Sequence, residues 1–235
     1  FMFTYPWAIV NAILMILFSL WGLFGKNRYA YLIAFLLFHL HYVARFSQGE
    51  ISHGSNFTGM AMLVLGLASF YFRDHPEKRR KFAFGMVLFF IGLGYTSASL
   101  CKLVATGPGW VDGAHLWMWI GERATDVLSQ HGAFALNELQ LLALEHKFIA
   151  TIILSIGLFT EFVGIGLWFR PTRAIVVTLL IGMHFGIAWS MNITFTYFMY
   201  ILPVIGYPLY KIFDYLLNQK QIRRLTVRLK QQRFK

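Results

Sequence analysis

Long apolar runs separated by short basic or polar stretches make up most of this 235-residue chain. A helix needs about 20 mostly apolar residues to cross a membrane, and seven runs approach that length. The pattern therefore predicts an all-α integral membrane fold, a bundle of about seven transmembrane helices. The predicted spans are residues 5–25, 29–46, 57–72, 82–104, 148–169, 174–190 and 195–209. The last two also fit a re-entrant pair, because both runs are short.

The stretch 105–145 between the fourth and fifth spans is too aromatic for a plain polar loop. Leu116, Trp117, Trp119 and Ile120 lie beside Glu122, Arg123 and Asp126. Such a segment predicts a helix that either lies in the membrane interface or packs on the mouth of the bundle, and the pattern favours neither. A second short helix is expected at 136–144.

The basic residues predict an orientation. With seven spans, 17 of the 21 Lys and Arg residues fall on one side and four on the other. Basic loops stay in the cytoplasm, so the C-terminus is expected inside, and the N-terminus and the long loop outside. The expected organisation is a transmembrane helical domain at 1–218, with 105–145 as its outer-face loop, and a basic cytoplasmic tail at 219–235. The first span is expected to be an anchor and not a removable signal peptide.

Composition narrows the class further. The chain is 57% hydrophobic and only 13% charged, whereas a soluble domain is usually about 25% charged. The net charge of +11 follows the spans and their flanks, so nucleic acid is not an expected partner, and membrane lipids are. One cysteine, Cys101, excludes an intramolecular disulfide and any multi-cysteine metal centre. No metal site is predicted.

Lys102, at the outer end of the fourth span, is the first candidate for chemistry. Ionisable groups inside a membrane are costly and mark functional sites. Tyr95, Ser99 and Lys102 are spaced to share one helix face, and the small residues before Lys102 permit close helix packing. A desolvated lysine can act as a base. The alternative is a lysine whose ammonium reaches the interface.

Two further ionisable residues fall inside predicted spans. Glu161 lies nine residues before Arg170, about 13 Å along a helix, and His184 lies midway through the sixth span. Either could relay protons or tune Lys102, and either could equally form a structural hydrogen bond between helices. Trp110 and Asn192 are expected, with Tyr95, to line the same outer cavity and bind substrate.

Two segments resemble a known family. Lys102-Leu103 followed by Gly109-Trp110-Val-Asp-Gly113 is similar to a lysine–Trp–x–acid–Gly segment of the horizontally transferred transmembrane domain family, which includes vitamin K-dependent gamma-glutamyl carboxylase. Thr160-Glu161-Phe162, Arg170-Pro-Thr-Arg173, His184 and Met191-Asn-Ile-Thr-Phe195 resemble its paired helices in order and spacing. The likeness extends over residues 29–208.

The resemblance implies a role for Lys102. In the carboxylase the matching lysine deprotonates reduced vitamin K on the luminal side, and the anion then reacts with oxygen to form the base that acts on glutamate. It implies a reduced, vitamin K-like quinone as cofactor, a quinone-binding oxidoreductase or carboxylase-like enzyme, and a catalytic set of Lys102, Glu161 and His184. The alternative is a non-catalytic anchor or scaffold subunit that binds membrane-protein partners through the aromatic loop and the basic tail. A small-solute transporter is the third hypothesis, and no internal repeat supports it.

Overall fold

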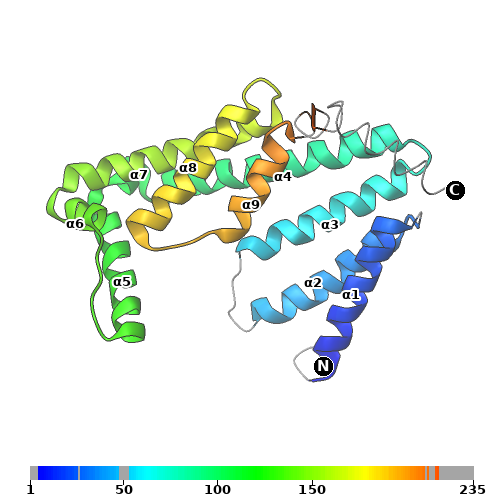
Figure 1. Cartoon of the computed structure of the whole chain (residues 1–235), viewed down its shortest axis with the longest axis horizontal. Coiled ribbons are helices and arrows are strands. Elements are labelled where there is room, and N and C mark those ends of the chain that lie inside the picture. Colours follow the sequence, from blue (N-terminus) through cyan, green and yellow to red (C-terminus); the bar gives the residue numbers. More distant parts are fainter. Residues whose placement is uncertain (1–4, 26, 48–52, 210, 212–214, 217–235) are drawn as a thin grey trace, which may run out of the picture.

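The computed structural model describes residues 5–25, 27–47, 53–209, 211 and 215–216, and this part of the chain is helical without a β-strand (Figure 1). The predicted tail at 219–235 lies outside the described residues. The elements, in order, are α1 (Trp7–Phe24), α2 (Ala30–Ser47), α3 (His53–Tyr71), α4 (Pro76–Thr106), the 3₁₀ helix η1 (Gly107–Val111), α5 (Gly113–His131), α6 (Glu138–Glu145), α7 (Lys147–Phe162), the 3₁₀ helix η2 (Val163–Trp168), α8 (Arg173–Met191) and α9 (Thr196–Gly206).

Five stretches are long and apolar enough to cross a membrane: α1, α2, α4 with η1, α7 with η2, and α8. Their exposed surface is rich in large apolar side chains; Leu17 is 55% exposed and Phe159 61% exposed. Such a surface fits lipid, because a soluble protein rarely leaves so much contiguous apolar area in water. The all-helical prediction is confirmed, together with a set of membrane-length helices.

The seventh predicted span, 195–209, contains a helix that is shorter than the span. The helix found there, α9, has 11 residues and ends at Gly206, which at 1.5 Å per residue is about 16 Å. Gly206 packs tightly on α8, since a Cβ there would lie 2.0 Å from a methyl group of Val177, and Pro208 follows at once. Apolar helix at the third predicted span is also short, at Asn56–Tyr71.

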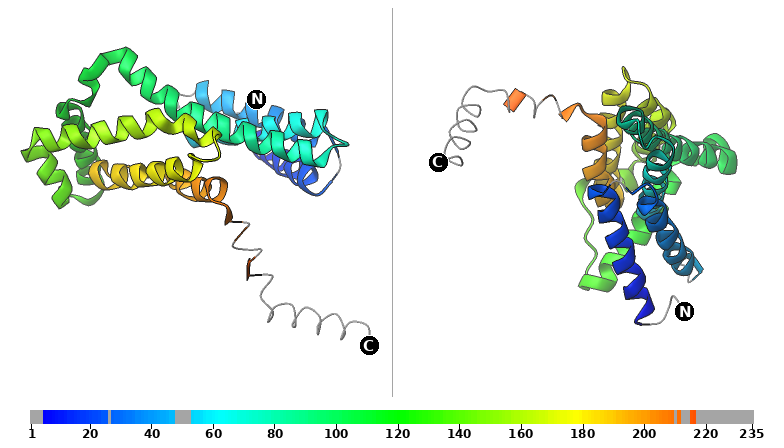
Figure 2. Two further views of the ribbon diagram at one scale, coloured as in Figure 1. Left: turned by 90° about the horizontal axis from the view of Figure 1, so that it is seen from above. Right: turned by 90° about the vertical axis from the view of Figure 1, so that its right-hand side faces the viewer.

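The 31-residue helix α4 organises the molecule (Figures 1 and 2). α3 packs along its first half, and α7 and η2 pack along its second half. α1 and α2 pair with each other, and α2 packs on α3. The α1–α2 and α3–α4 connections lie together at the end of the molecule away from α5 and α6 (Figure 1).

The predicted long loop is almost entirely helical and packs on the bundle. α5 turns away from the axes of α4 and α7 (Figure 1), and its buried Leu116 and Ile120 join a core cluster with Ala143, Ala150 and Leu154. Of the two readings of this segment, packing on the bundle is therefore observed. The second short helix is α6, found at Glu138–Glu145.

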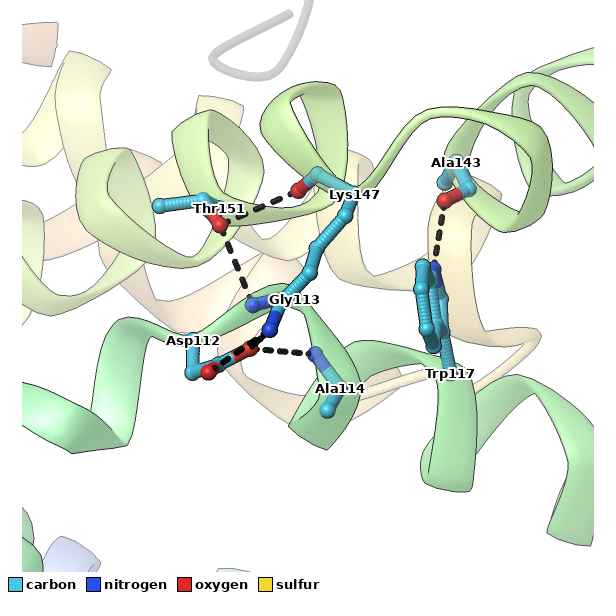
Figure 3. A network of polar contacts seen from close by, with 7 residues as sticks. All are labelled: Asp112, Gly113, Ala114, Trp117, Ala143, Lys147 and Thr151. Carbon is cyan, nitrogen blue, oxygen red and sulfur yellow. Dashed lines mark hydrogen bonds and ion pairs between the residues drawn. The ribbon is translucent and has the colours of Figure 1, made fainter.

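A polar network fixes the start of α5 to α7 (Figure 3). Asp112 caps α5 by accepting from the Ala114 amide at 3.0 Å, and the Lys147 ammonium lies 2.8 Å from the same carboxylate. The Gly113 amide donates to the Thr151 hydroxyl at 3.1 Å. Only glycine fits here, because a Cβ at Gly113 would lie 2.5 Å from the Lys147 carbonyl oxygen.

The Trp117 indole holds the next turn of α5. It donates to the Ala143 carbonyl of α6 at 2.6 Å (Figure 3). Together with the Asp112 network, this bond joins α5, α6 and α7 into one unit at this end of the bundle, adjacent to η1 and its Trp110.

Small residues bring α4 against the end of α7. A Cβ at Gly92 would lie 2.7 Å from the Gly164 carbonyl oxygen, so the two backbones are in contact. The Thr96 hydroxyl donates to the Phe162 carbonyl at 3.1 Å and accepts from the Ile165 amide at 2.9 Å. It thereby satisfies backbone groups where α7 changes to the 3₁₀ helix η2, which would otherwise lack partners. This contact sets the spacing of the side chains described next.

Candidate functional site

A cavity of about 620 Å³ lies between α3, α4, α7, α8 and α9. Its walls are mostly apolar, and few polar side chains enter it. This mixture of an apolar lining with a few convergent polar groups is typical of small-molecule sites. The polar side chains lining it include those of Asn56, Tyr95, Lys102, Glu161 and His184.

Lys102 and Glu161 form a two-point ion pair across the α4–α7 contact. The Lys102 amine donates to both carboxylate oxygens of Glu161, at 2.6 and 2.5 Å. The Lys102 side chain is 30% exposed and that of Glu161 12% exposed. Ser99, one turn before Lys102 on the same face, is fully buried and donates to the Leu158 carbonyl at 3.2 Å. The prediction that Tyr95, Ser99 and Lys102 share one face is confirmed.

Trp110 completes the surroundings of the ammonium. The Lys102 nitrogen lies 4.6 Å from the centroid of the Trp110 ring, within the range of a cation–π contact. Trp110 lies in η1, which directly follows α4. The turn between them is at Gly107, which has φ +61°, a conformation that favours glycine. This turn folds the Trp110 ring back over the Lys102 ammonium. The ammonium is held from two sides, by a carboxylate and by an aromatic ring.

Tyr95 and His184 form the second polar pair. The Tyr95 hydroxyl lies 2.5 Å from His184 Nε2, and His184 is 4% exposed. The imidazole stacks on Phe198 with an angle of 10° between the rings. Its Nδ1 is buried and has no hydrogen-bond partner among the described residues. An orphaned buried nitrogen is costly, so this ring edge is a ready position for a polar group of a bound molecule.

A second cavity, of about 600 Å³, lies on the other side of Lys102. It is formed by the end of α4, η1 and α5, and its lining includes Cys101, Lys102, Trp110, His115 and Glu122. Lys102 therefore lines both cavities. The ion pair lies between the mostly apolar cavity inside the bundle and the second, more open cavity beside α5.

The structure places five of the six predicted site residues at one of these cavities: Tyr95, Lys102, Glu161 and His184 in the first, and Trp110 in the second. Asn192 lies elsewhere. It is exposed, ends α8 in the left-handed conformation at φ 54°, and lines neither cavity. Its residue type suits that cap, since Asn tolerates positive φ better than most residues.

Sequence reasoning missed the contributions of α3 and α9. Phe57 and Phe198 line the cavity and pack on each other with ring centroids 6.3 Å apart. Phe195, at the start of α9, lies 5.1 Å from the His184 ring. The available signal was the i, i+3 spacing of Phe195 and Phe198 directly after the histidine helix, which puts both rings on one face. In a chain with 24 Phe this signal does not stand out.

Among the described residues, no three His, Cys, Asp or Glu side chains come close enough together to hold a metal ion. Comparison with models of known protein families, with curated proteins and with solved structures gives no match. The function is therefore argued from the geometry of this chain.

Proposed function

We propose that this chain is a multi-pass membrane protein that binds a reduced quinone in the cavity between α3, α4 and α8, and that the Lys102–Glu161 pair removes a proton from its hydroxyl. The observation that carries the proposal is a two-point ion pair lining a mostly apolar cavity. An ion pair in such surroundings is expensive to desolvate. A charge kept there despite that cost is more often functional than structural.

The shape and lining of the cavity suit a flat, lipid-soluble ring. Phe57, Phe195 and Phe198 supply aromatic walls, and the lining includes the Lys102–Glu161 and Tyr95–His184 pairs. Leu93 and Ser97 of α4 line the cavity and are exposed on the surface of the bundle. The cavity therefore opens along the side of α4, which supports entry of a ligand from the lipid phase.

The ion pair has a definite capacity for protons. With Lys102 donating to both oxygens of Glu161, the lysine already carries its proton. A proton leaving the hydroquinone hydroxyl then binds to a Glu161 oxygen, while the quinol oxyanion faces the Lys102 ammonium. The O–H bond of the ligand breaks, an O–H bond forms on Glu161, and the net charge of site plus ligand is unchanged. The base is thus the pair and not Lys102 alone.

The fixed position of the Lys102 ammonium supports its role as the group that stabilises the quinol oxyanion, with Glu161 as the proton acceptor. Trp110 and Glu161 fix the ammonium before any ligand binds, so no reorganisation is needed when negative charge develops on the ligand oxygen. Tyr95 and His184 lie in the same cavity, with His184 Nδ1 free of a partner within the described chain. They are suited to bind the second oxygen of a quinone ring.

The orientation that the proposal uses comes from the distribution of basic residues. The α1–α2 connection carries Arg28, the α3–α4 connection carries Arg73, and the first turns of α4 carry four basic residues at 78–81. These segments lie at the end away from α5 (Figure 1). We take that end as cytoplasmic, with Lys102, Trp110 and α5 toward the outer face. Seven crossings, with α3 and α9 as short spans, are part of the proposal.

Orientation has its own test. In a Cys101→Ser background, single cysteines at exposed Lys78 and at exposed Gln130 of α5 are exposed to a membrane-impermeant maleimide in intact cells. The proposal expects labelling of Gln130→Cys only, with Lys78→Cys labelled after lysis. Labelling of Lys78→Cys in intact cells would reverse the assigned sides.

The binding test uses purified protein in mild detergent, titrated anaerobically with reduced menaquinone and followed by quenching of tryptophan fluorescence. Wild type is expected to bind, and Lys102→Ala to bind about tenfold or more weakly, as the loss of a charge-assisted hydrogen bond predicts. Lys147→Ala is the matched control, because Lys147 is also an ion-paired lysine near this end of the bundle. Equal binding by all three proteins, together with co-purifying protein partners, would support the scaffold subunit instead.

A further inference from the structure

A third cavity, of about 590 Å³, lies at the opposite end of the bundle from α5, where α1, α2, α3 and α4 meet. Its lining includes four arginines, Arg28, Arg73, Arg79 and Arg80, and no acidic side chain among the residues that the structure describes. These arginines come from the α1–α2 connection, the α3–α4 turn and the first turns of α4. They are far apart in the sequence, and the fold gathers them around one space.

The guanidinium groups of this cluster form no ion pair in the described part of the chain, although the charge of Arg80 also acts on Glu77. Arg28 donates to the Tyr29 hydroxyl at 2.6 Å and lies over the Tyr29 and Phe70 rings. Neither Arg73, Arg79 nor Arg80 forms an ion pair with a described residue. The nearby Glu77 pairs with Lys81 at 2.7 Å, outside the cavity lining. Four like charges around one space repel one another, so an anion that enters it relieves that repulsion.

The lining is basic at one part and apolar at another. Asn27 and Ser69 add hydrogen-bonding groups to the lining, and Leu65 and Val87 line it about one turn before Ser69 in α3 and about two turns after Arg80 in α4. Leu23 and Phe84 line the cavity and are also exposed on the outside of the bundle, at 64% and 43%. A ligand in this cavity would therefore meet arginines with its head and apolar helix surface with its remaining part.

We infer that this cavity binds a phosphate group of an anionic ligand, through Arg73, Arg79 and Arg80. Arginine matches phosphate geometry with paired N–H donors, and basic pockets between membrane helices on the cytoplasmic side bind lipid headgroups. The continuity with exposed apolar surface favours an anionic phospholipid of that leaflet over a soluble phosphate compound. The inference does not depend on the chemistry proposed for Lys102.

The test compares two double variants of the full chain that each remove two positive charges from the same helix. Arg79→Gln/Arg80→Gln alters the cavity lining, whereas Lys78→Gln/Lys81→Gln removes exposed charges that do not line it. Each protein is purified from vesicles of phosphatidylcholine with added phosphatidylglycerol, and the retained lipids are counted by native mass spectrometry. A separate arm titrates pyrophosphate into protein held in phosphatidylcholine alone.

The expected result is selective retention of phosphatidylglycerol by wild type. Retention should fall by about fivefold for each arginine removed, and by a smaller factor in the lysine variant, because neither lysine lines the cavity. Pyrophosphate binding that depends on Arg79 and Arg80, without retention of phosphatidylglycerol, would support the phosphate site and assign its ligand to solution. Equal losses in the two variants, or no retention and no pyrophosphate binding, would overturn the inference.

Arg79→Lys/Arg80→Lys guards against a folding defect, because it keeps both charges and removes only the paired donors. It is expected to retain less phosphatidylglycerol than wild type and more than the glutamine variant. Retention equal to wild type would contradict a site that uses arginine geometry.

Discussion

Lys102 of α4 and Glu161 of α7, 59 positions apart in the chain, meet in a two-point ion pair across the contact between these helices. Gly92, about three turns before Lys102, lies against Gly164, which follows Glu161 by three residues. Thr96 and Ser99, about one to two turns before Lys102, donate hydrogen bonds to α7 carbonyls. Small residues on the facing surfaces of α4, α7 and η2 therefore let the helices approach closely enough for the lysine of α4 to reach the carboxylate of α7. The same stretch of α4 provides Tyr95 for the neighbouring pair with His184.

The ion pair should contribute measurably to stability. Breaking a buried pair costs several kcal/mol because a charge is left without a partner, and the partial exposure of Lys102 reduces that cost here. We expect Glu161→Ala to lower the free energy of unfolding by about 2 kcal/mol, and the double variant with Lys102→Met to recover part of the loss. A double-mutant cycle in detergent measures the coupling energy. The exposed Lys81–Glu77 pair is the control and should show a smaller coupling energy; equal couplings would contradict the prediction.

Tyr95→Phe removes the only hydrogen-bond partner that the described chain gives to His184. Both ring nitrogens would then be buried without a partner, at a cost of about 1–2 kcal/mol. Tyr197→Phe is a suitable comparison, because its hydroxyl makes a longer contact, 3.2 Å, with Thr58, and the residue is 43% exposed. Unfolding monitored by circular dichroism should show a clear loss for Tyr95→Phe and a smaller one for Tyr197→Phe.

Gly92 tests the close approach of α4 to η2. Gly92→Ala would place a Cβ 2.7 Å from the Gly164 carbonyl oxygen, so the two backbones must separate, at a cost of about 1–3 kcal/mol. Gly85→Ala, in the same helix, meets no atom within 4 Å and should be neutral or stabilise by up to about 1 kcal/mol through helix propensity. Thermal unfolding of the two variants checks the difference, and similar effects at both positions would refute the close contact.

The pH dependence of α5 docking follows from Asp112. The Ala114 amide and the Lys147 ammonium both stabilise the carboxylate and lower the pKa of Asp112 from its ordinary value. The stability that this depressed pKa contributes is present above the unfolded value of about 3.9 and is lost as the pH falls through the lower folded value. Hydrogen exchange at the first amides of α5 should therefore speed up as the pH falls below about 4, after correction for the intrinsic rate. Asp112→Asn should remove this dependence; an unchanged profile in that variant would assign it to another group.

The apolar runs predicted the helices well, because the length of a run reports directly on the helix that lipid would surround. The apolar pattern did not predict the charged start of α4. The helix begins at Pro76, six residues before the predicted span, because Pro suits the first turn of a helix and Glu77 pairs with Lys81. In the seventh predicted span, α9 ends at Gly206, three residues before the end of the apolar run at 209, because Gly206 and Pro208 are unfavourable in a helix.

The candidate site was predictable in part. Lys102, Glu161 and His184 stood out because ionisable residues are rare in apolar runs, and all three line one cavity. Their pairing was not predictable, since it depends on which helix faces meet. For the same reason the roles of Thr96 and Phe198 escaped notice, and Asn192 was placed at the cavity although its backbone conformation directs it to a helix cap.

The absorption spectrum of bound quinol tests the central claim most directly. Reduced menaquinone is added anaerobically at neutral pH to wild type, Lys102→Ala, Glu161→Gln and the control Lys147→Ala, and the spectrum of the bound fraction is recorded. The account predicts a quinol anion in wild type and in Lys147→Ala, and neutral quinol in the other two, because Glu161 takes the proton and Lys102 stabilises the oxyanion. Neutral quinol bound equally in all four proteins, or no binding to wild type, would contradict it.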